Sequence, residues 1–163
     1  MNAVTLIAPI ADFSQVAALP ARSDAYGAQQ VLLLTSRETK RWVIPKGWPM
    51  RGRKPHEAAA REALEEAGVI GHVKKKPIGS YVYFKRRAAH FDVCTVEVYL
   101  LRVERQLETW REKHQRQARW FTPDEAAELV QEPGLIALLR SFARSSEGEA
   151  FPRSLDRVAG MSA

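Results

Sequence analysis

The stretch from Gly47 to Val69 reads GWPMRGRKPHEAAAREALEEAGV and decides the fold. Side chains three and four residues apart lie on the same face of an α-helix, so Glu62, Glu65 and Glu66 form one acidic cluster. Four apolar residues fall on the opposite side, where we expect them to pack against a sheet: Ala60, Ala63, Leu64 and Ala67.

Three like charges on one helix face repel one another unless a cation neutralises them. Mg²⁺ suits such a face, because it typically takes one or two protein carboxylates and completes its octahedron with water and phosphate oxygens. The cluster therefore indicates a divalent metal site. From the three glutamates alone, an ordinary solvated Glu-rich face is the more common explanation. The residues that flank the cluster distinguish the two interpretations.

These flanking residues favour the metal site. The stretch resembles the Nudix box, G-x5-E-x7-R-E-U-x-E-E-x-G-U, in which U is a bulky aliphatic residue. Six of the seven fixed residue types match, which at average residue frequencies has a chance probability on the order of one in ten thousand. The matching residues are Gly47, Arg61, Glu62, Glu65, Glu66 and Gly68, followed by Val69 at the last U position.

Two positions depart from the pattern. Arg53 stands where the family has its first glutamate, and Ala63 stands where it has a larger aliphatic residue. In the family that glutamate helps to hold the box arginine, so Arg53 raises a question about activity but not about the fold. Glu57 and Glu65, four residues before and after Arg61, can clamp this arginine instead. We also expect an unpaired Arg53 to be available to a phosphate.

Length and composition predict one compact cytoplasmic domain. The chain has 163 residues, of which 45% are hydrophobic and 27% charged, which is ordinary globular usage. No apolar run approaches the roughly 20 residues of a membrane span, so we expect no membrane partner. The first residues, MNAVTLIAPIADF, lack the basic region of a secretory signal. The single cysteine, Cys94, lies in a strand-like segment and is interpreted as a reduced core residue.

The net charge of +6 favours an anionic partner. The basic residues form three runs: Lys74 to Lys76, Lys85 to Arg87, and Arg51, Arg53 and Lys54 in the box. Such fields concentrate polyphosphates and attract RNA equally well. For the first run, a role in solubility alone is as good an explanation. The other two flank the acidic helix or end a strand that we expect beside it.

Periodicity and turn residues predict an α/β fold with a mixed β-sheet. Strands are expected at 15–22, 29–35, 41–44, 78–87 and 91–103, the last two paired as a hairpin, with another strand beginning at His72. Helices are expected from Pro55 to Gly68, from Thr122 to about Val130, and over 135–143. These elements, like the resemblance, imply a Nudix-type α/β/α sandwich. We expect an uncertain leader over 1–14, one domain over 15–144 and a flexible tail over 145–163.

Within the superfamily, the chain resembles the branch that hydrolyses diphosphoinositol polyphosphates and diadenosine polyphosphates. The resemblance extends over roughly residues 15 to 140 and rests on VLLLTSRETKRWVIPKGW, GSYVYFKRR and RQARWFTPDEA. Together with the box, it gives the expected substrate-binding residues: Ser36, Arg37, Lys46, Gly47, Arg53, Lys85, Arg87 and Arg116.

The activity that the resemblance implies is hydrolysis of a phosphoanhydride in a dinucleoside or diphosphoinositol polyphosphate, with Mg²⁺ or alternatively Mn²⁺. Glu62 and Glu66 are the first expected metal ligands. Glu65 is either a third ligand or the general base, and Glu62 and Arg61 complete the expected catalytic set. The partner is then a small anionic polyphosphate.

Two other function classes remain open. Arg53 favours a binding or regulatory module with impaired catalysis, although the intact glutamates argue against it. The basic surface favours an RNA 5′-end pyrophosphohydrolase, whose partner is RNA. Glu108 or Glu112, in the polar segment before Arg116, is expected to supply a further carboxylate from a loop. The sequence specifies no oligomeric state.

Overall fold

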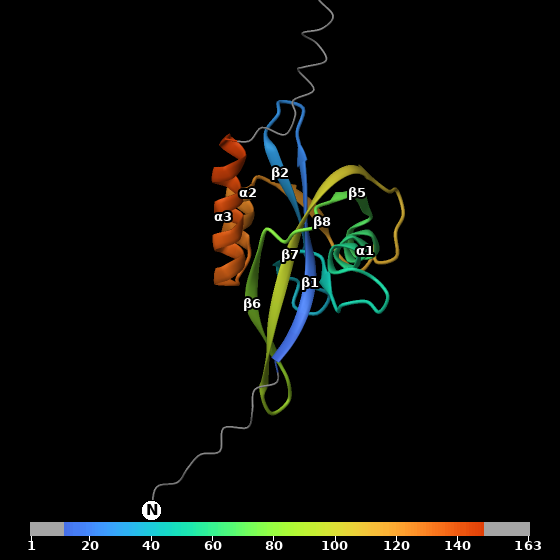
Figure 1. Cartoon of the computed structure of the whole chain (residues 1–163), viewed down its shortest axis with the longest axis vertical. Coiled ribbons are helices and arrows are strands. Elements are labelled where there is room, and N and C mark those ends of the chain that lie inside the picture. The colour runs from blue at the N-terminus through green and yellow to red at the C-terminus, as the bar shows by residue number, and fades with distance from the viewer. Residues whose placement is uncertain (1–11, 149–163) are drawn as a thin grey trace, which may run out of the picture.

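The computed structural model describes residues 12–148, which form one mixed sheet with helices on both of its faces (Figure 1). The strands are β1 (Asp12–Ser23), β2 (Gln29–Thr35), β3 (Trp42–Val43), β4 (Lys46–Gly47), β5 (Val69–Val73), β6 (Gly79–Arg86), β7 (Phe91–Gln106) and β8 (Ala118–Phe121), and the helices are α1 (Pro55–Ala67), α2 (Pro123–Leu129) and α3 (Pro133–Gly148). None of these helices is long and apolar enough to cross a membrane.

The sheet is built around a parallel pair of long strands. β1 and β7 run in register from Asp12 opposite Val93 to Ala21 opposite Arg102. The other pairings are antiparallel: β2 and β4 join β1, β3 and β8 join β2, and β5 and β6 join β7. The predicted mixed α/β architecture is confirmed.

Alternation along the central strands divides the core into two layers. Leu19 of β1 and Leu100 of β7 pack in the cluster that contains α2 and α3. Ala18 and Leu101, one residue away on each strand, pack in the cluster that contains α1. Because successive strand residues point to opposite faces, α1 lies on one side of the sheet and α2 and α3 on the other (Figure 1).

Helix α1 approaches the sheet through small side chains. Ala58, Ala59, Ala63 and Ala67 are fully buried. The expected stripe was wrong in part, since Ala60 and Leu64 are only partly buried. The two preceding alanines take their place, because Ala59, Ala63 and Ala67 follow one another at i+4 spacing and form a continuous apolar stripe with Ala58.

The ends of α1 match the prediction. Pro55 begins the helix, and Gly68 follows its last residue with a φ of 68°, a left-handed conformation that favours glycine. A Cβ added to Gly68 would also overlap the indole ring of Trp110. Gly68 therefore ends the helix and lets the loop after β7 pack across it.

Several boundaries differ from the sequence prediction. β5 begins at Val69 rather than His72, because its ladder with β7 starts directly after Gly68. β8 was not predicted and exists through its pairing with β2. β1 extends back to Asp12, and α3 continues to Gly148, so that the predicted tail begins inside a helix. Residues 1–11 of the predicted leader and 149–163 of the predicted tail lie outside the described residues.

Candidate active site

Acidic side chains of α1 face β4. Glu62 packs so closely on Gly47 that a Cβ on this glycine would overlap its carboxylate. Glu66 is 8% exposed and accepts a hydrogen bond from the amide N–H of Lys46, with an N···O distance of 3.3 Å. The close approach explains why glycine suits position 47. The structure thus brings two expected metal ligands together with two expected substrate contacts.

The loop after β7 adds a further carboxylate. The indole N–H of Trp110 donates to the Glu66 carbonyl at 3.2 Å, and the amide of Glu112 donates to the Glu65 carbonyl at 3.1 Å. These bonds satisfy carbonyls that the end of a helix leaves without partners. They also place Glu112 beside the acidic cluster. Glu108, the other candidate, is exposed, and in residues 12–148 no contact joins its carboxylate to the cluster.

Arg116 connects this cluster to the end of β2. Its side chain is 10% exposed, with Nη2 3.6 Å from Glu66 Oε1 and Nε 3.4 Å from Glu112 Oε1. Its Nη1 donates to the carbonyl of Thr35 at 3.2 Å. One predicted phosphate contact therefore lies directly beside the predicted metal ligands.

Burial and mutual repulsion perturb the acidic groups strongly. Burial is the largest cause that raises the pKa of Glu62 to about 7, and the charges of Glu65 and Glu112 add to it. Burial also raises the pKa of Glu66 to about 7, although Arg116 opposes the shift. Carboxylates with raised pKa values hold either a proton or a cation.

The donor set fits a hard divalent ion. Carboxylate oxygens are the ligands that Mg²⁺ and Mn²⁺ prefer. Between Asp12 and Gly148, no three acidic, histidine or cysteine side chains already surround a single point. Arg116 instead pairs with Glu66 and Glu112, and partly offsets the charge that a metal would neutralise.

The box arginine is held by only one of its two expected partners. Arg61 Nε lies 2.9 Å from Glu65 Oε1, and Arg111 Nη1 lies 3.7 Å from the same oxygen. Glu57 was expected to share this role, which was wrong. It instead accepts a hydrogen bond from the amide of Lys54 at 3.2 Å, because the first amides of a helix lack partners.

Between Asp12 and Gly148, no ion pair or hydrogen bond joins the Arg53 side chain to the acidic cluster. Arg53 is exposed and lines a shallow cavity of about 290 Å³ together with Glu57 and Arg61, on a neighbouring stripe of α1. Neither Glu62 nor Glu66 lines this cavity. Arg61, which pairs with Glu65, lines the same cavity, so Arg53 lies on the Arg61 side of α1.

A cavity of about 480 Å³ adjoins Arg116 and is also lined by Lys40, Trp42 and His114. Arg37 contacts another lining residue, since its Nη1 lies 3.4 Å from Gln115 Oε1. The cavity thus gathers basic side chains beside the acidic cluster, as a phosphate site requires.

Ser36 and Lys46, two further predicted substrate contacts, have different surroundings. Ser36 Oγ lies 2.6 Å from Thr39 Oγ1 and accepts a hydrogen bond from the amide of Arg41, so that it shapes the turn after β2. Lys46 Nζ lies 5.1 Å from the centre of the Tyr83 ring, and burial lowers the pKa of this lysine.

Lys85 and Arg87 lie in the β6–β7 hairpin, which projects from one end of the molecule (Figure 1). Arg87 Nε is 2.6 Å from Asp92 Oδ2, and Lys85 stands opposite Asp92 in the ladder. In the described part of the chain, no ion pair or hydrogen bond joins either cation to the acidic cluster.

Sequence reasoning missed the roles of Trp110 and Thr35. Trp110 lies in a polar segment without periodicity, so no local pattern predicted that its ring would pack on Gly68. Thr35 anchors the loop from the other side, because its Oγ1 accepts a hydrogen bond from the amide of Gln117 at 2.9 Å.

Comparisons with known proteins agree with this geometry. A family model described as NUDIX domain matches residues 15–142. Nudix hydrolase 12, mitochondrial, of Arabidopsis thaliana is 34% identical over 124 residues, which are 74% of this chain and 61% of that protein. Diphosphoinositol polyphosphate phosphohydrolase 3-beta of Bos taurus is 31% identical over 103 residues, which are 62% of this chain and 59% of that protein. The chain spans 53% to 66% of the length of these and similar curated relatives.

The fold has solved counterparts as well. The binary complex of C. elegans Ap4A hydrolase superposes with a TM-score of 0.63 at 20% identity, and the match covers 84% of this chain and 99% of that chain. The E. coli ORF135 protein gives a TM-score of 0.59 at 20% identity, and the match covers 88% of this chain and 96% of that one. The box residues, the sheet topology and the match over 15–142 together establish that the chain belongs to the NUDIX domain family.

Proposed function

We propose that this protein is a Nudix hydrolase that cleaves a phosphoanhydride bond in a dinucleoside polyphosphate or a diphosphoinositol polyphosphate, with Mg²⁺ or Mn²⁺ as cofactor. The observation that carries the proposal is the convergence of Glu62, Glu66 and Glu112 beside Arg116. The names of the bovine relative and of the C. elegans structure support the substrate class.

Glu62 and Glu66 would hold the metal, and its third ligand would be whichever of Glu65 and Glu112 is not the general base. When bound, the metal would supply charge neutralisation at the phosphate oxygens and a water of lowered pKa. The raised pKa values of Glu62 and Glu66 support this assignment, because buried carboxylates gain most from a nearby cation. Gly47 lets Glu62 lie against the backbone of β4, and the Lys46 amide orients Glu66.

The chain's basic residues would bind and orient the substrate. Arg116 joins the carboxylates to the cavity lined by Lys40 and His114, and a planar guanidinium matches the oxygens of a phosphate. Arg37, beside the same cavity, extends the positive field. A polyphosphate bound here would reach from the cavity to the acidic cluster.

The general base would be Glu65 or Glu112. Glu65 is oriented by Arg61 and Arg111, whereas Glu112 faces the cluster from a loop. Either carboxylate can take a proton from the attacking water only if it is free of a metal bond in that step. Glutamine substitutions separate the two, as described below.

The test is phosphorus NMR of purified protein with Mg²⁺ and a panel of diadenosine polyphosphates, nucleoside triphosphates, a diphosphoinositol polyphosphate and triphosphorylated RNA. We expect cleavage of one of the two small polyphosphate classes. Exclusive cleavage of RNA would replace the proposal by the RNA 5′-end activity. No cleavage across the panel while Mg²⁺ still binds would favour a binding module.

A further inference from the structure

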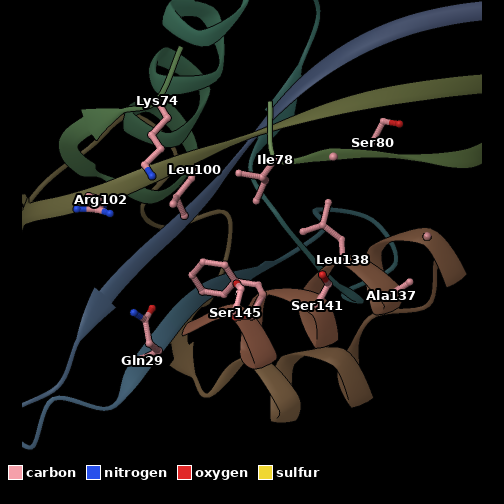
Figure 2. A pocket seen from close by; sticks show the side chains of 13 residues that line it. Gln29, Lys74, Ile78, Ser80, Leu100, Arg102, Ala137, Leu138, Ser141 and Ser145 are labelled. Carbon is pink, nitrogen blue, oxygen red and sulfur yellow. The ribbon is translucent and has the colours of Figure 1, made fainter. Parts of the chain in front are cut away.

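Helix α3 covers the start of the β6–β7 hairpin, and the rest of the hairpin projects from the molecule. Ile78 and Ser80 lie beside α3, where the helix and the sheet enclose a cavity of about 500 Å³ (Figure 2). Gly134 of α3 packs so closely on Tyr81 that a Cβ on this glycine would collide with it. Beyond Tyr81 the hairpin extends past the helices to one end of the molecule (Figure 1).

The projecting part of the hairpin carries an exposed apolar face. Tyr83 of β6 and Cys94 of β7 are buried in the cluster that contains α2 and α3. Val82, Phe84 and Phe91 alternate with these residues, so their side chains point to the opposite face. Phe84 is 65% exposed, Phe91 54% and Val82 43%. Large apolar side chains exposed together in this way mark an interaction surface.

The strand register places a cation beside the two rings. Phe84 stands opposite Val93, and Arg86 stands opposite Phe91. Phe84 and Phe91 are therefore diagonal neighbours, at roughly 7–8 Å, and Arg86 flanks both rings. Among the described residues, no ion pair or hydrogen bond holds the Arg86 side chain. The face thus presents two aromatic rings and an unpaired guanidinium.

The nearest acidic side chains are already engaged. Asp92 is buried, accepts a hydrogen bond from Arg87 Nε at 2.6 Å and lies 2.9 Å from His90 Nε2. Glu97, the next acidic residue of β7, accepts a hydrogen bond from the Tyr99 hydroxyl at 2.8 Å. With these carboxylates held, the end of the hairpin presents a positive field to an anionic partner.

The size and position of the face disfavour two other occupants. Its three apolar side chains expose roughly 300 Å², well below the about 800 Å² that each partner buries in a stable dimer. A second copy on a two-fold axis would also bring two Arg86 side chains together. A membrane favours bulky apolar residues at the tip of a loop, whereas Ala88 and Ala89 form the tip here.

We propose that this face binds single-stranded RNA. Two successive unpaired bases would stack on Phe84 and Phe91, and Arg86 would contact the phosphate between them. Val82 would extend the apolar surface beneath the first base. Thr95, which is exposed and stands opposite Val82, would hydrogen-bond a ribose 2′-hydroxyl and so favour RNA over DNA. This binding needs no metal and goes beyond the hydrolysis proposed above.

The experiment measures fluorescence anisotropy of a labelled oligouridylate with a 5′-hydroxyl end, mixed with the full-length protein in EDTA. This probe contains no phosphoanhydride, so its binding is independent of the hydrolysis that phosphorus NMR tests. We expect saturable binding that weakens as the salt concentration rises. Amide shifts of the ¹⁵N-labelled protein should centre on β6 and β7 around Phe84 and Phe91. An oligodeoxyuridylate of the same length should bind about threefold more weakly, through loss of one hydrogen bond.

Matched variants test the site itself. Phe84→Ala should weaken binding at least about fivefold, because a base loses its stacking partner, and Phe84→Trp should retain it. Tyr26→Ala removes an even more exposed ring from the β1–β2 turn and should leave the affinity within about twofold. Arg86→Ala should weaken binding and lower the slope of log affinity against log salt by about one. Lys75→Ala, at an exposed position in the loop before β6, is the matched control and should leave this slope unchanged.

Several results would overturn the proposal. One is the absence of saturable binding by the native protein, and another is an equal effect of Phe84→Ala and Tyr26→Ala. Equal affinity for the RNA and DNA oligomers would contradict the selection of RNA. Amide shifts confined to α1 and β4 would place the RNA at the acidic cluster. Dimerisation that Phe84→Ala abolishes, measured by light scattering, or Phe84-dependent binding to anionic vesicles would assign the face to a second copy or to a membrane.

Discussion

Arg116 and Glu66 form an ion pair in which each side chain is 10% exposed, with 3.6 Å between Nη2 and Oε1. A buried pair of this kind contributes little net stability, but removal of one partner leaves the other charge without compensation. Glu66 escapes part of this penalty, because its carboxylate can take up a proton. The pair therefore couples protonation, metal binding and stability at one position.

Arg116→Met should destabilise the metal-free protein by about 2 kcal/mol at pH 8 and by clearly less at pH 5. At pH 5 Glu66 is already protonated in both proteins, since its pKa is about 7 in the native one. Urea unfolding in EDTA at both pH values measures the difference. An equal loss at both would show that Arg116 acts through packing alone.

The metal-free protein should lose stability as the pH rises from about 4.5 to 7. Glu62 and Glu66 have pKa values of about 7 when folded against an ordinary value of 4.5, so the folded state binds more protons in this window. Stability then falls with rising pH, by at most about 1.4 kcal/mol per pH unit for the buried Glu66 and by less for the half-exposed Glu62.

Urea midpoints measured across this range in EDTA, and again with Mg²⁺, provide the check. Mg²⁺ should reduce the dependence of stability on pH, because the metal ion takes the place of the protons on the carboxylates. Glu66→Gln should also reduce this dependence in EDTA. A stability that rises between pH 4.5 and 7 in EDTA would contradict the raised pKa values of Glu62 and Glu66.

Glu66→Gln should keep the fold and lower Mg²⁺-dependent kcat at least about 100-fold, because the amide cannot replace an anionic metal ligand. Glu65→Gln and Glu112→Gln distinguish the base: the variant that loses kcat while keeping its Mg²⁺ affinity identifies it. Glu108→Gln, in the same loop as Glu112, serves as the control and should retain full activity. Unchanged turnover in Glu66→Gln would remove the acidic helix from the mechanism.

Arg53→Glu should raise kcat about twofold and leave KM unchanged. The new carboxylate would stand in the shallow cavity beside Arg61 and give this arginine a second anionic partner. Steady-state kinetics on the substrate identified by phosphorus NMR measures kcat and KM of this variant. A higher KM would instead show that Arg53 binds the substrate.

Gly68→Ala should destabilise the protein by about 3 kcal/mol. The left-handed backbone at a φ of 68° penalises a Cβ, and the new methyl group would overlap Trp110. Gly52→Ala is the matched control, because its φ is 77° but nothing lies within 4 Å of an added Cβ. It should cost only about 1 kcal/mol. Equal losses in urea unfolding would mean that the loop moves away from α1 without penalty.

The local sequence was sufficient to predict the acidic helix and the family. Pro55, Gly68 and the spacing of Glu62, Glu65 and Glu66 act within a few residues of one another, so periodicity and capping rules predict their geometry. The buried strand β2 was predicted in the same way, from a short apolar run bounded by turn residues.

Only the tertiary structure decided which groups join that helix. The segment between β7 and β8 has no periodicity, and its path follows from the carbonyls at the end of α1 and from the packing of Trp110 on Gly68. These contacts bring Glu112 and Arg116 to the acidic cluster and leave Glu108 outside it. These contacts join residues more than forty positions apart in the chain. Local sequence patterns predict only contacts between nearby residues, so they could not predict these.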